Sequence, residues 1–296
     1  MNNKKINTLA SLGLILTAAI WGFAFVVVKD SLDFVPPIYM TAIRFLIAGV
    51  VLVIILNKRL KVLNKDYILQ GVFTGLFLGT AYITQTIGCN FTTAGKNAFL
   101  TTVYVILIPL ILWPINKKRP SIVVFISAIM ALTGIGFFAL RHESGVGLKM
   151  NFGDIMTLIC GVFYALHIIF TARFGKDKNM LILSAIQFLT ASVLAWLFAP
   201  IFDGSLKLNE IFQSKVIISM LYLGIFSSLV AFCLQNVCLK YMESSLASLF
   251  LSLESVFGVI FSAIFLKERM SAIMILGCVL IFCAITIAEQ FKEKEK

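Results

Sequence analysis

Two charged side chains lie deep inside apolar stretches of this sequence, where a charge needs a chemical reason. Glu254 is the one acidic residue well inside such a stretch, and Arg44 is the one basic residue there. Desolvating an unpaired ion costs several kcal/mol. A carboxylate held away from water can exchange protons near neutral pH, and a buried guanidinium can attract a carboxylate. Glu254 and Arg44 are therefore candidates for proton coupling or for recognition of a charged solute.

Each of these residues also has a second explanation. Glu254 could accept structural hydrogen bonds, pair with a base or bind the amine of a substrate. Arg44 could anchor its helix by pairing with Asp30, Asp33 or a helix C-terminus. His167, the one histidine inside an apolar stretch, could titrate as well. The sequence leaves these alternatives open.

Uncharged polar and aromatic residues recur at helical spacing in the apolar stretches. Asn97, Thr101 and Tyr104 stand at i, i+4 and i+7, on one narrow helix face. Comparable faces on other predicted helices, together with the face of Glu254, are expected to surround one central cavity for a medium-sized amphipathic solute. The predicted cavity residues are Trp21, Tyr82, Gln85, Asn97, Thr101, Tyr104, Tyr164, His167 and Gln235. Polar stripes of this kind can equally form a seam between helices.

Small residues mark the expected packing faces. Gly71, Gly75 and Gly79 form a face on which another helix can approach closely, which also suits a helix that moves. A second stripe, assigned to packing, consists of Ser245, Ser248, Ser252 and Ser255. The six cysteines lie within or at the ends of apolar stretches, none as Cys-x-x-Cys, so we expect small buried side chains. We expect no catalytic residue, no metal and no cofactor.

The composition shows which elements must position these residues. Of the 296 residues, 60% are hydrophobic and only 13% are charged, with a mean hydropathy of +0.99. A soluble domain carries about 25% charged residues, so a soluble enzyme and a disordered chain are both excluded. A membrane-spanning helix needs about 20 residues. Ten spans are predicted, at residues 8–28, 35–56, 67–88, 96–115, 121–140, 154–173, 180–200, 215–238, 245–266 and 271–290. We therefore predict an all-α polytopic membrane protein with ten transmembrane helices, the fourth of them kinked at Pro109.

The basic residues that give the net charge of +11 lie in predicted loops rather than on a surface that could bind nucleic acid. Lys and Arg residues stand in short clusters between the predicted spans, so nucleic acid is not an expected partner. With the N-terminus inside, the inner side holds 16 of them and the outer side holds 8. This bias predicts a multi-pass protein of the cell membrane with both termini cytoplasmic. The first apolar stretch has no clear cleavage site and is interpreted as a helix, not a signal peptide.

The chain repeats itself in two halves. Arg44-Phe45-Leu46 aligns with Gln187-Phe188-Leu189 at an offset of 143 residues, and Gln85 aligns with Gln235 at an offset of 150. Five helices per half is an odd number, so the second half must cross the membrane in the opposite sense. We therefore predict two inverted five-helix repeats, residues 1–148 and 149–296, in one integrated membrane domain. Inverted repeats are typical of secondary transporters, whose substrate site lies near the midplane between the halves.

Short motifs spread over nearly the whole chain match a known pattern in order and spacing. They are Trp21-Gly22-Phe23-Ala24-Phe25, Pro37 followed by Arg44-Phe45, residues 98–104 with Pro109, Leu253-Glu254, and Phe265-Leu266-Lys267-Glu268-Arg269. In these the chain resembles the ten-helix drug/metabolite transporter superfamily, specifically its EamA-type branch. Two positions depart from the family pattern. Ser255 stands where the family often has proline, and Lys118 stands where the second half keeps Glu268.

The resemblance implies export or exchange of amino acids, related metabolites or drugs by alternating access. We expect a secondary transporter for a small metabolite, an amino acid or a related amphipathic solute, working in efflux. A drug or multidrug exporter and a metabolite importer of the same fold are alternatives. An integral membrane enzyme is the alternative from another class, although His142-Glu143 lacks a second histidine at metal-ligand spacing. The expected partners are a small-molecule substrate and the lipid bilayer, with proton coupling, in a monomer or weak homodimer.

Overall fold

A computed structural model of the protein describes residues 3–117, 119–139, 141–142, 145–146, 150–268 and 272–294. Lys118 and Arg269 of the motifs above, and the predicted boundary between residues 148 and 149, lie outside these ranges. The first half contains α1 (Asn3–Ser31), α2 (Pro37–Leu56), η1 (Asn57–Val62), α3 (Lys65–Phe91), α4 (Ala94–Thr101), α5 (Tyr104–Asn116) and α6 (Ile122–Ala139). A hairpin of β1 (Arg141–His142) and β2 (Gly145–Val146) follows. The second half contains α7 (Phe152–Phe174), α8 (Met180–Phe202), α9 (Leu208–Ile211), α10 (Ser214–Leu221), η2 (Tyr222–Val230), α11 (Ala231–Leu239), α12 (Ser244–Leu251), α13 (Leu253–Phe265) and α14 (Ala272–Lys294).

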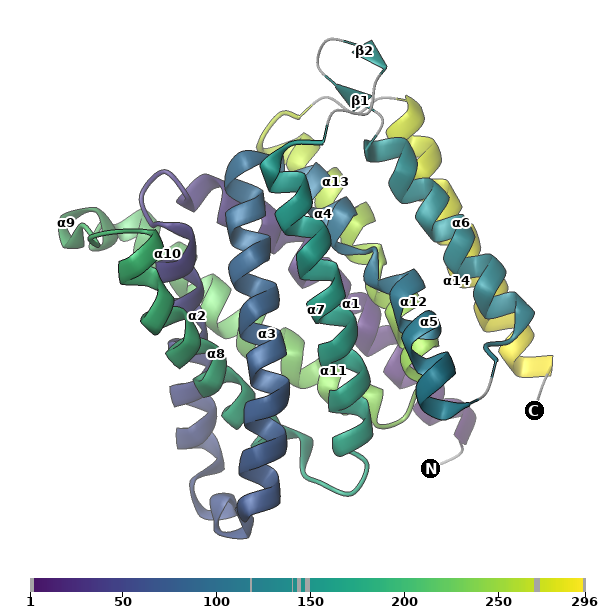
Figure 1. The fold of residues 1–296 in the computed structure, drawn as a ribbon, viewed down its shortest axis with the longest axis horizontal. Coiled ribbons are helices and arrows are strands. Elements are labelled where there is room, and N and C mark those ends of the chain that lie inside the picture. Colours follow the sequence, from purple (N-terminus) through teal and green to yellow (C-terminus); the bar gives the residue numbers. More distant parts are fainter. Residues whose placement is uncertain are drawn as a thin grey trace.

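Eight helical segments of the described chain are long and apolar enough to cross a membrane. They are Ile6–Ser31, Pro37–Val62, Lys65–Phe91, Ala94–Asn116, Phe152–Phe174, Met180–Phe202, Ser214–Leu239 and Ser244–Phe265. Two shorter apolar segments, Ile122–Gly134 of α6 and Ile275–Ile287 of α14, belong to helices that pack side by side at one edge of the bundle (Figure 1). The predicted helical, multi-pass membrane architecture is confirmed.

The bundle has two distinct ends. Figure 1 shows the β1–β2 hairpin at one end, and shows α1 beginning and α14 ending at the other. We call these the hairpin end and the terminal end. The last turn of α3 lies at the hairpin end, because Asn151, just before α7, donates from Nδ2 to the carbonyl of Phe91 at 3.0 Å. The last turn of α1 lies beside it, since Lys29 donates from Nζ to the carbonyls of Cys89 at 2.9 Å and Thr92 at 2.7 Å.

Two of the spanning segments are broken near their middle. The fourth predicted span divides at Thr102–Val103 into α4 and α5, a break that the sequence did not predict, while the kink at Pro109 stays a prediction. Pro109 lies inside α5, and the break forms upstream, where Thr102 donates from Oγ1 to the carbonyl of Phe99 at 2.7 Å. The break between α12 and α13 at Ser252 occurs 150 residues later, without a proline.

The serine stripe explains that second break. Ser248, Ser252 and Ser255 each donate from Oγ to the carbonyl three residues earlier, at 2.6–2.7 Å. Such back-bonding competes with the helical ladder and bends a helix. All four serines of the stripe are buried in the bundle, with exposed fractions of 5% or less.

Helix ends are satisfied by local caps and by partners from distant helices. Asn64 accepts the N–H of Tyr67 at the start of α3, and Asn151 with Asp154 forms a capping box at the start of α7. The start of α2 has no side-chain cap of its own. There, Asp203, just after α8, accepts the N–H groups of Ile38 at 2.6 Å and Tyr39 at 3.1 Å. Helices from the two halves are therefore tied together at their ends.

The predicted glycine face lies against α8. A Cβ atom added to Gly71 would come within 2.6 Å of Ile186, and one added to Gly75 within 2.9 Å of the carbonyl oxygen of Gln187. A Cβ at Gly79 would meet the Cα of Ala191 at 3.0 Å. Side chains at these positions would push α3 away from α8, because backbone atoms cannot yield as a flexible side chain can.

Candidate binding cavity

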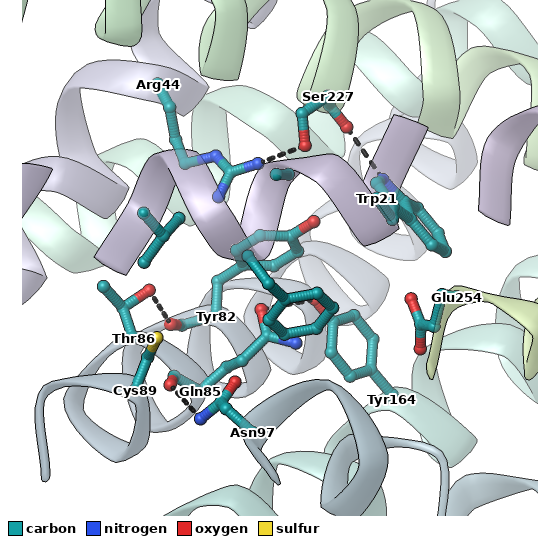
Figure 2. Close-up of a pocket in the computed structure, with 13 residues that line it drawn as sticks. Trp21, Arg44, Tyr82, Gln85, Thr86, Cys89, Asn97, Tyr164, Ser227 and Glu254 are labelled. Carbon is teal, nitrogen blue, oxygen red and sulfur yellow. Dashed lines mark hydrogen bonds between the residues drawn. The ribbon is translucent and has the colours of Figure 1, made fainter. Parts of the chain in front are cut away.

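A cavity lies in the bundle where seven elements converge (Figure 2). Its lining reaches Cys89, near the end of α3 that lies at the hairpin end. Its lining residues are Trp21, Ala24, Phe25 and Val28 of α1, Arg44 of α2, Tyr82, Gln85, Thr86 and Cys89 of α3, Asn97 of α4, Tyr164 of α7, Ser227 of η2 and Glu254 of α13. The cavity volume is ≈ 20 Å³. A space of this size holds about one water molecule, so this conformation is closed around its polar residues.

Arg44 is 2% exposed and is held by neutral groups from the second half of the chain. Its Nε donates to the hydroxyl of Ser228 at 2.9 Å, and one terminal nitrogen donates to the hydroxyl of Ser227 at 2.7 Å. The guanidinium carbon lies 4.5 Å from the centroid of the Tyr82 ring. Hydroxyl dipoles and a ring face stabilise the cation without cancelling its charge.

The sequence alternative that Arg44 pairs with an acidic residue near the end of α1 is wrong for Asp30. Asp30 is bound instead by Lys215, with Nζ 2.8 Å from Oδ2 at a partly exposed position. Arg44 lies about two turns inside α2, and its side chain is directed towards the serines of η2. The serine pair was missed because nothing in a single apolar stretch indicates that its hydroxyls face an arginine far away in the chain.

Glu254 lies in the first turn of α13, directly after the break at Ser252, and is 3% exposed. The hydroxyl of Tyr104 donates to its Oε1 at 3.0 Å. Tyr104 stands at the matching place in the first half, in the first turn of α5 after the break at Thr102–Val103. The two breaks therefore bring a carboxylate and a phenol together in the interior.

The two charged groups approach the cavity from different sides. Figure 2 shows Arg44 and Glu254 well apart, with the rings of Tyr82 and Tyr164 drawn between them. Neither group takes part in an ion pair within the described residues. The cavity thus presents a positive group and a negative group across an aromatic wall. This arrangement can bind a solute that carries both charges on an apolar body, because such a solute would complete both pairs at once.

A polar wall joins α3, α4 and α7. Asn97 donates from Nδ2 to the carbonyl of Gln85 at 3.1 Å and to the hydroxyl of Thr157 at 2.9 Å. Gln85 donates from Nε2 to the hydroxyl of Thr101 at 3.2 Å and accepts from the hydroxyl of Tyr164 at 3.4 Å. The Oδ1 atom of Asn97 is buried and has no partner in the described part of the chain. It is a free acceptor for a hydrogen-bond donor in the cavity.

The predicted site residues divide into two groups. Seven of them line the cavity: Trp21, Tyr82, Gln85, Asn97, Tyr164, Arg44 and Glu254. Four of them, Thr101, Tyr104, His167 and Gln235, are buried but lie outside the lining. Thr101 and Tyr104 support lining residues through hydrogen bonds, whereas His167 and Gln235 lie in a different part of the interior. The structure therefore places four of the predicted residues outside the lining of this cavity.

Charged contacts close the hairpin end above the cavity. Glu268 accepts the N–H groups of Ala94 at 3.1 Å and Gly95 at 3.3 Å, at the start of α4. The ammonium of Lys96 lies 2.7 Å from Oδ2 of Asp154, which is 1% exposed. The contacts of Glu268 and of Lys96 with Asp154 join helices of both halves. Lys29, on the carbonyls that end α3, joins α1 to α3 within the first half.

Cysteine substitution can distinguish the residues that line the cavity from the residues that lie behind the lining. We expect Asn97→Cys and Tyr164→Cys to react with a water-soluble thiol reagent and to be protected by bound substrate. Thr101→Cys, one turn further along α4, is expected to react more slowly because Thr101 lies behind the lining. The measurement is the labelling rate of single-cysteine variants, with the lipid-exposed Leu76→Cys as a control. Equal rates at Asn97 and Leu76 would contradict the assignment of the cavity.

A multi-pass membrane protein whose helices enclose a polar, bipolar cavity has the architecture of a transport protein. The chain belongs to the EamA-like transporter family, whose model matches residues 8–140 and 151–289. The resemblance found in the sequence motifs is thereby confirmed.

Individual relatives agree with this assignment. An uncharacterized transporter of Archaeoglobus fulgidus is 33% identical over 282 residues, covering 94% of this chain and 85% of that protein. The uncharacterized transporter YoaV of Bacillus subtilis is 24% identical over 278 residues, covering 93% of this chain and 94% of its own length. Both are named as transporters, which agrees with a transport protein rather than an enzyme.

A solved crystal structure with the same fold is among the structural matches. It has a TM-score of 0.76 and 19% sequence identity, and the match covers 97% of this chain and 98% of that chain. At this identity the similarity shows the fold alone.

Proposed function

We propose that the protein is a secondary transporter of the cell membrane that moves a small zwitterionic metabolite, such as an amino acid, by alternating access. The observation that carries the proposal is the cavity with Arg44 and Glu254 on different sides, each bound to neutral groups. A carboxylate of the solute would bind Arg44, and its ammonium group would bind Glu254. The rings of Trp21, Tyr82 and Tyr164 would contact its apolar part.

Alternating access is supported by the closed state of the cavity. A space of ≈ 20 Å³ cannot hold a metabolite, so binding requires helices to separate. Charged contacts between helices of both halves hold the hairpin end together. When that end opens, water molecules can take the place of these contacts as hydrogen-bond partners of the separated groups. A rocking motion of one half against the other opens one end while it closes the other.

We propose ten spans arranged as two inverted repeats, residues 1–148 and 149–296. The apolar cores of α6 and α14 supply the two spans beyond the eight longer ones. The repeat is supported by helix breaks 150 residues apart and by two separate matches to the same family model. The excess of Lys and Arg near the terminal end supports cytoplasmic termini, which puts the hairpin end outside.

Coupling to protons would give the transport its direction. Glu254 is a buried carboxylate, and its charge is neutralised either by a proton or by the ammonium group of the solute. Since the two compete for one carboxylate, the carrier would cross the membrane with one or the other. Proton entry would then drive solute exit, which is efflux by exchange. The cavity is enclosed by one chain, which supports function as a monomer, with a weak homodimer as the alternative.

Counterflow in proteoliposomes tests this proposal. Vesicles preloaded with an unlabelled amino acid should accumulate the labelled amino acid transiently, in a saturable way, for at least one member of a panel. A drug exporter of the same fold would exchange bulky apolar cations from the panel instead, and an importer would show uptake driven by symport. Absence of saturable exchange for every zwitterion in the panel would overturn the substrate class.

A further inference from the structure

A second buried polar cluster lies nearer the terminal end, outside the cavity. We call it the Gln187 cluster, and its members come from α3, α7, α8 and α11. They are Thr74, His167, Thr171, Ser184, Gln187 and Asn236, each with 0% exposure. Burying six polar side chains together in a membrane bundle is unfavourable unless they hydrogen-bond to one another or line the path of a solute.

Gln187 is the centre of this cluster. Its Nε2 donates to the hydroxyls of Thr74 at 2.9 Å and Thr171 at 3.0 Å. Its Oε1 accepts from Nδ2 of Asn236 at 3.1 Å, and Asn236 also donates to the hydroxyl of Ser184 at 2.8 Å. The cluster contains no Asp, Glu, Lys or Arg, so it offers neutral donors and acceptors only.

The hydrogen bonding of the Gln187 cluster is incomplete at His167. Its Nδ1 lies 3.2 Å from the carbonyl oxygen of Thr74. Its Nε2 is fully buried and has no hydrogen-bond partner among the described residues. An unpartnered polar atom in the interior costs about 1–3 kcal/mol, and a hydrogen-bonding group of a solute would remove this cost.

The ring of Phe232 contacts both the Gln187 cluster and the cavity lining, and the rings of Phe45 and Phe188 pack against it. Phe232 of α11 is 0% exposed, and its ring centroid lies 4.7 Å from that of Trp21 and 5.6 Å from that of Tyr82. On its other side the same ring lies 5.9 Å from His167. Phe232 therefore contacts the linings of both polar regions.

The two polar regions are related by the sequence repeat. Arg44 of the cavity aligns with Gln187 at the offset of 143, and Tyr82 aligns with Phe232 at the offset of 150. Arg44 of α2 donates to Ser227 in the third span of the other half. Gln187 of α8, the corresponding helix, donates to Thr74 of α3, again the third span of the other half.

We propose that the Gln187 cluster is a second solute-binding station, facing the terminal end, and that Phe232 is the barrier between it and the cavity. In an inverted repeat, the motion that closes one cavity opens the repeat-related one. The station would take the uncharged hydrogen-bonding groups of a solute, such as hydroxyl or amide groups, because its own side chains are neutral. This inference rests on the proposed alternating access, but not on the zwitterionic substrate class.

The direct test is the accessibility of single cysteines from the terminal end. The native cysteines are replaced, and Ser184→Cys is introduced because the substitution is nearly isosteric; Thr74→Cys is the second variant. A charged, membrane-impermeant methanethiosulfonate reagent is applied to sealed vesicles of either orientation. We expect both introduced thiols to react from the terminal end at least about ten times faster than Leu76→Cys, a lipid-exposed position on α3, a ratio worth ~1.4 kcal/mol.

The barrier is tested by Phe232→Ala in the Ser184→Cys background. Truncation should let reagent added at the hairpin end reach the thiol introduced by Ser184→Cys about tenfold faster, a factor equal to ~1.4 kcal/mol. Phe73→Ala, a truncation at a lipid-exposed ring of α3, should leave the rate unchanged.

The outcomes separate this inference from the proposed substrate class. Labelling from the terminal end in a protein that exchanges no zwitterion would support the station and overturn the substrate class. Zwitterion exchange with both introduced thiols as slow as Leu76→Cys would overturn the station and leave the proposed function intact. An unchanged rate in Phe232→Ala would overturn the barrier.

Discussion

Replacing Arg44 with glutamine is expected to raise the solute concentration for half-maximal counterflow by about ten- to a hundredfold, because a hydrogen bond to a charged group is worth ~1.5–3 kcal/mol. Gln retains a donor for Ser227, so the helix contact can persist while the charge is lost. Arg44→Lys keeps the charge but not the forked donors, and its effect should be intermediate. The measurement is the concentration dependence of counterflow in proteoliposomes.

The loss of affinity in Arg44→Gln should affect only solutes that carry a carboxylate. Exchange of the corresponding amine, which lacks a carboxylate, should be equally weak in wild type and Arg44→Gln. Lys215→Gln removes a positive charge from a partly exposed ion pair and should leave half-saturation unchanged. If amine and amino acid lost affinity together in Arg44→Gln, Arg44 would be a structural anchor and not a carboxylate-binding group.

Replacing Glu254 with glutamine is expected to abolish the response to an imposed pH gradient. Exchange of solute for solute should continue, but with half-saturation at about ten times the wild-type solute concentration, because the charge that binds the ammonium group is lost. In the wild type, a gradient of one pH unit supplies ~1.4 kcal/mol per proton and therefore up to about tenfold accumulation. Gln can still accept the hydrogen bond from Tyr104 but cannot carry a proton. The measurement is gradient-driven uptake beside counterflow in the same vesicles.

A matched control comes from an exposed carboxylate of the same type. Glu243, just before α12, has no side-chain capping bond, so Glu243→Gln should keep the full gradient response. A full response in Glu254→Gln would contradict proton coupling through this residue. Loss of both gradient response and exchange would assign Glu254 to binding of the solute amine alone.

The sequence predicts the helices well because each needs only a local run of apolar residues. It places Asn97, Gln85 and Tyr164 in the cavity for a similarly local reason, since each belongs to a polar face of an otherwise apolar helix. All three residues line the cavity, and each lies within a regular stretch of α3, α4 or α7.

The predictions fail where the helical pattern is interrupted or where a partner comes from far away in the chain. Tyr104 would share a face with Asn97 in a continuous helix, but the break at Thr102–Val103 lies between these two residues. Thr101 precedes the break, and its hydroxyl accepts a hydrogen bond from Gln85. His167 follows Tyr164 by three residues, yet it lies outside the cavity lining, in contact with the ring of Phe232. Only the packing of distant spans decides these positions.

The partners of Arg44 could not be predicted for the same reason. An intramembrane arginine needs acceptors, and the nearest acids in the sequence are Asp30 and Asp33. The structure uses hydroxyls of Ser227 and Ser228, in a π-helical turn of the other half. The consequence for function is large, because neutral partners leave the charge of Arg44 available to a solute.

The central claim is that one cavity recognises both charges of a zwitterion, and counterflow with a matched set of three solutes tests it most directly. The set is the amino acid that exchanges best, the amine without its carboxylate and the acid without its amine. We predict that the amine and the acid each compete at least about tenfold more weakly than the amino acid, since each lacks a charge-assisted bond. Equal competition by all three solutes, or no exchange of the amino acid, would contradict the claim.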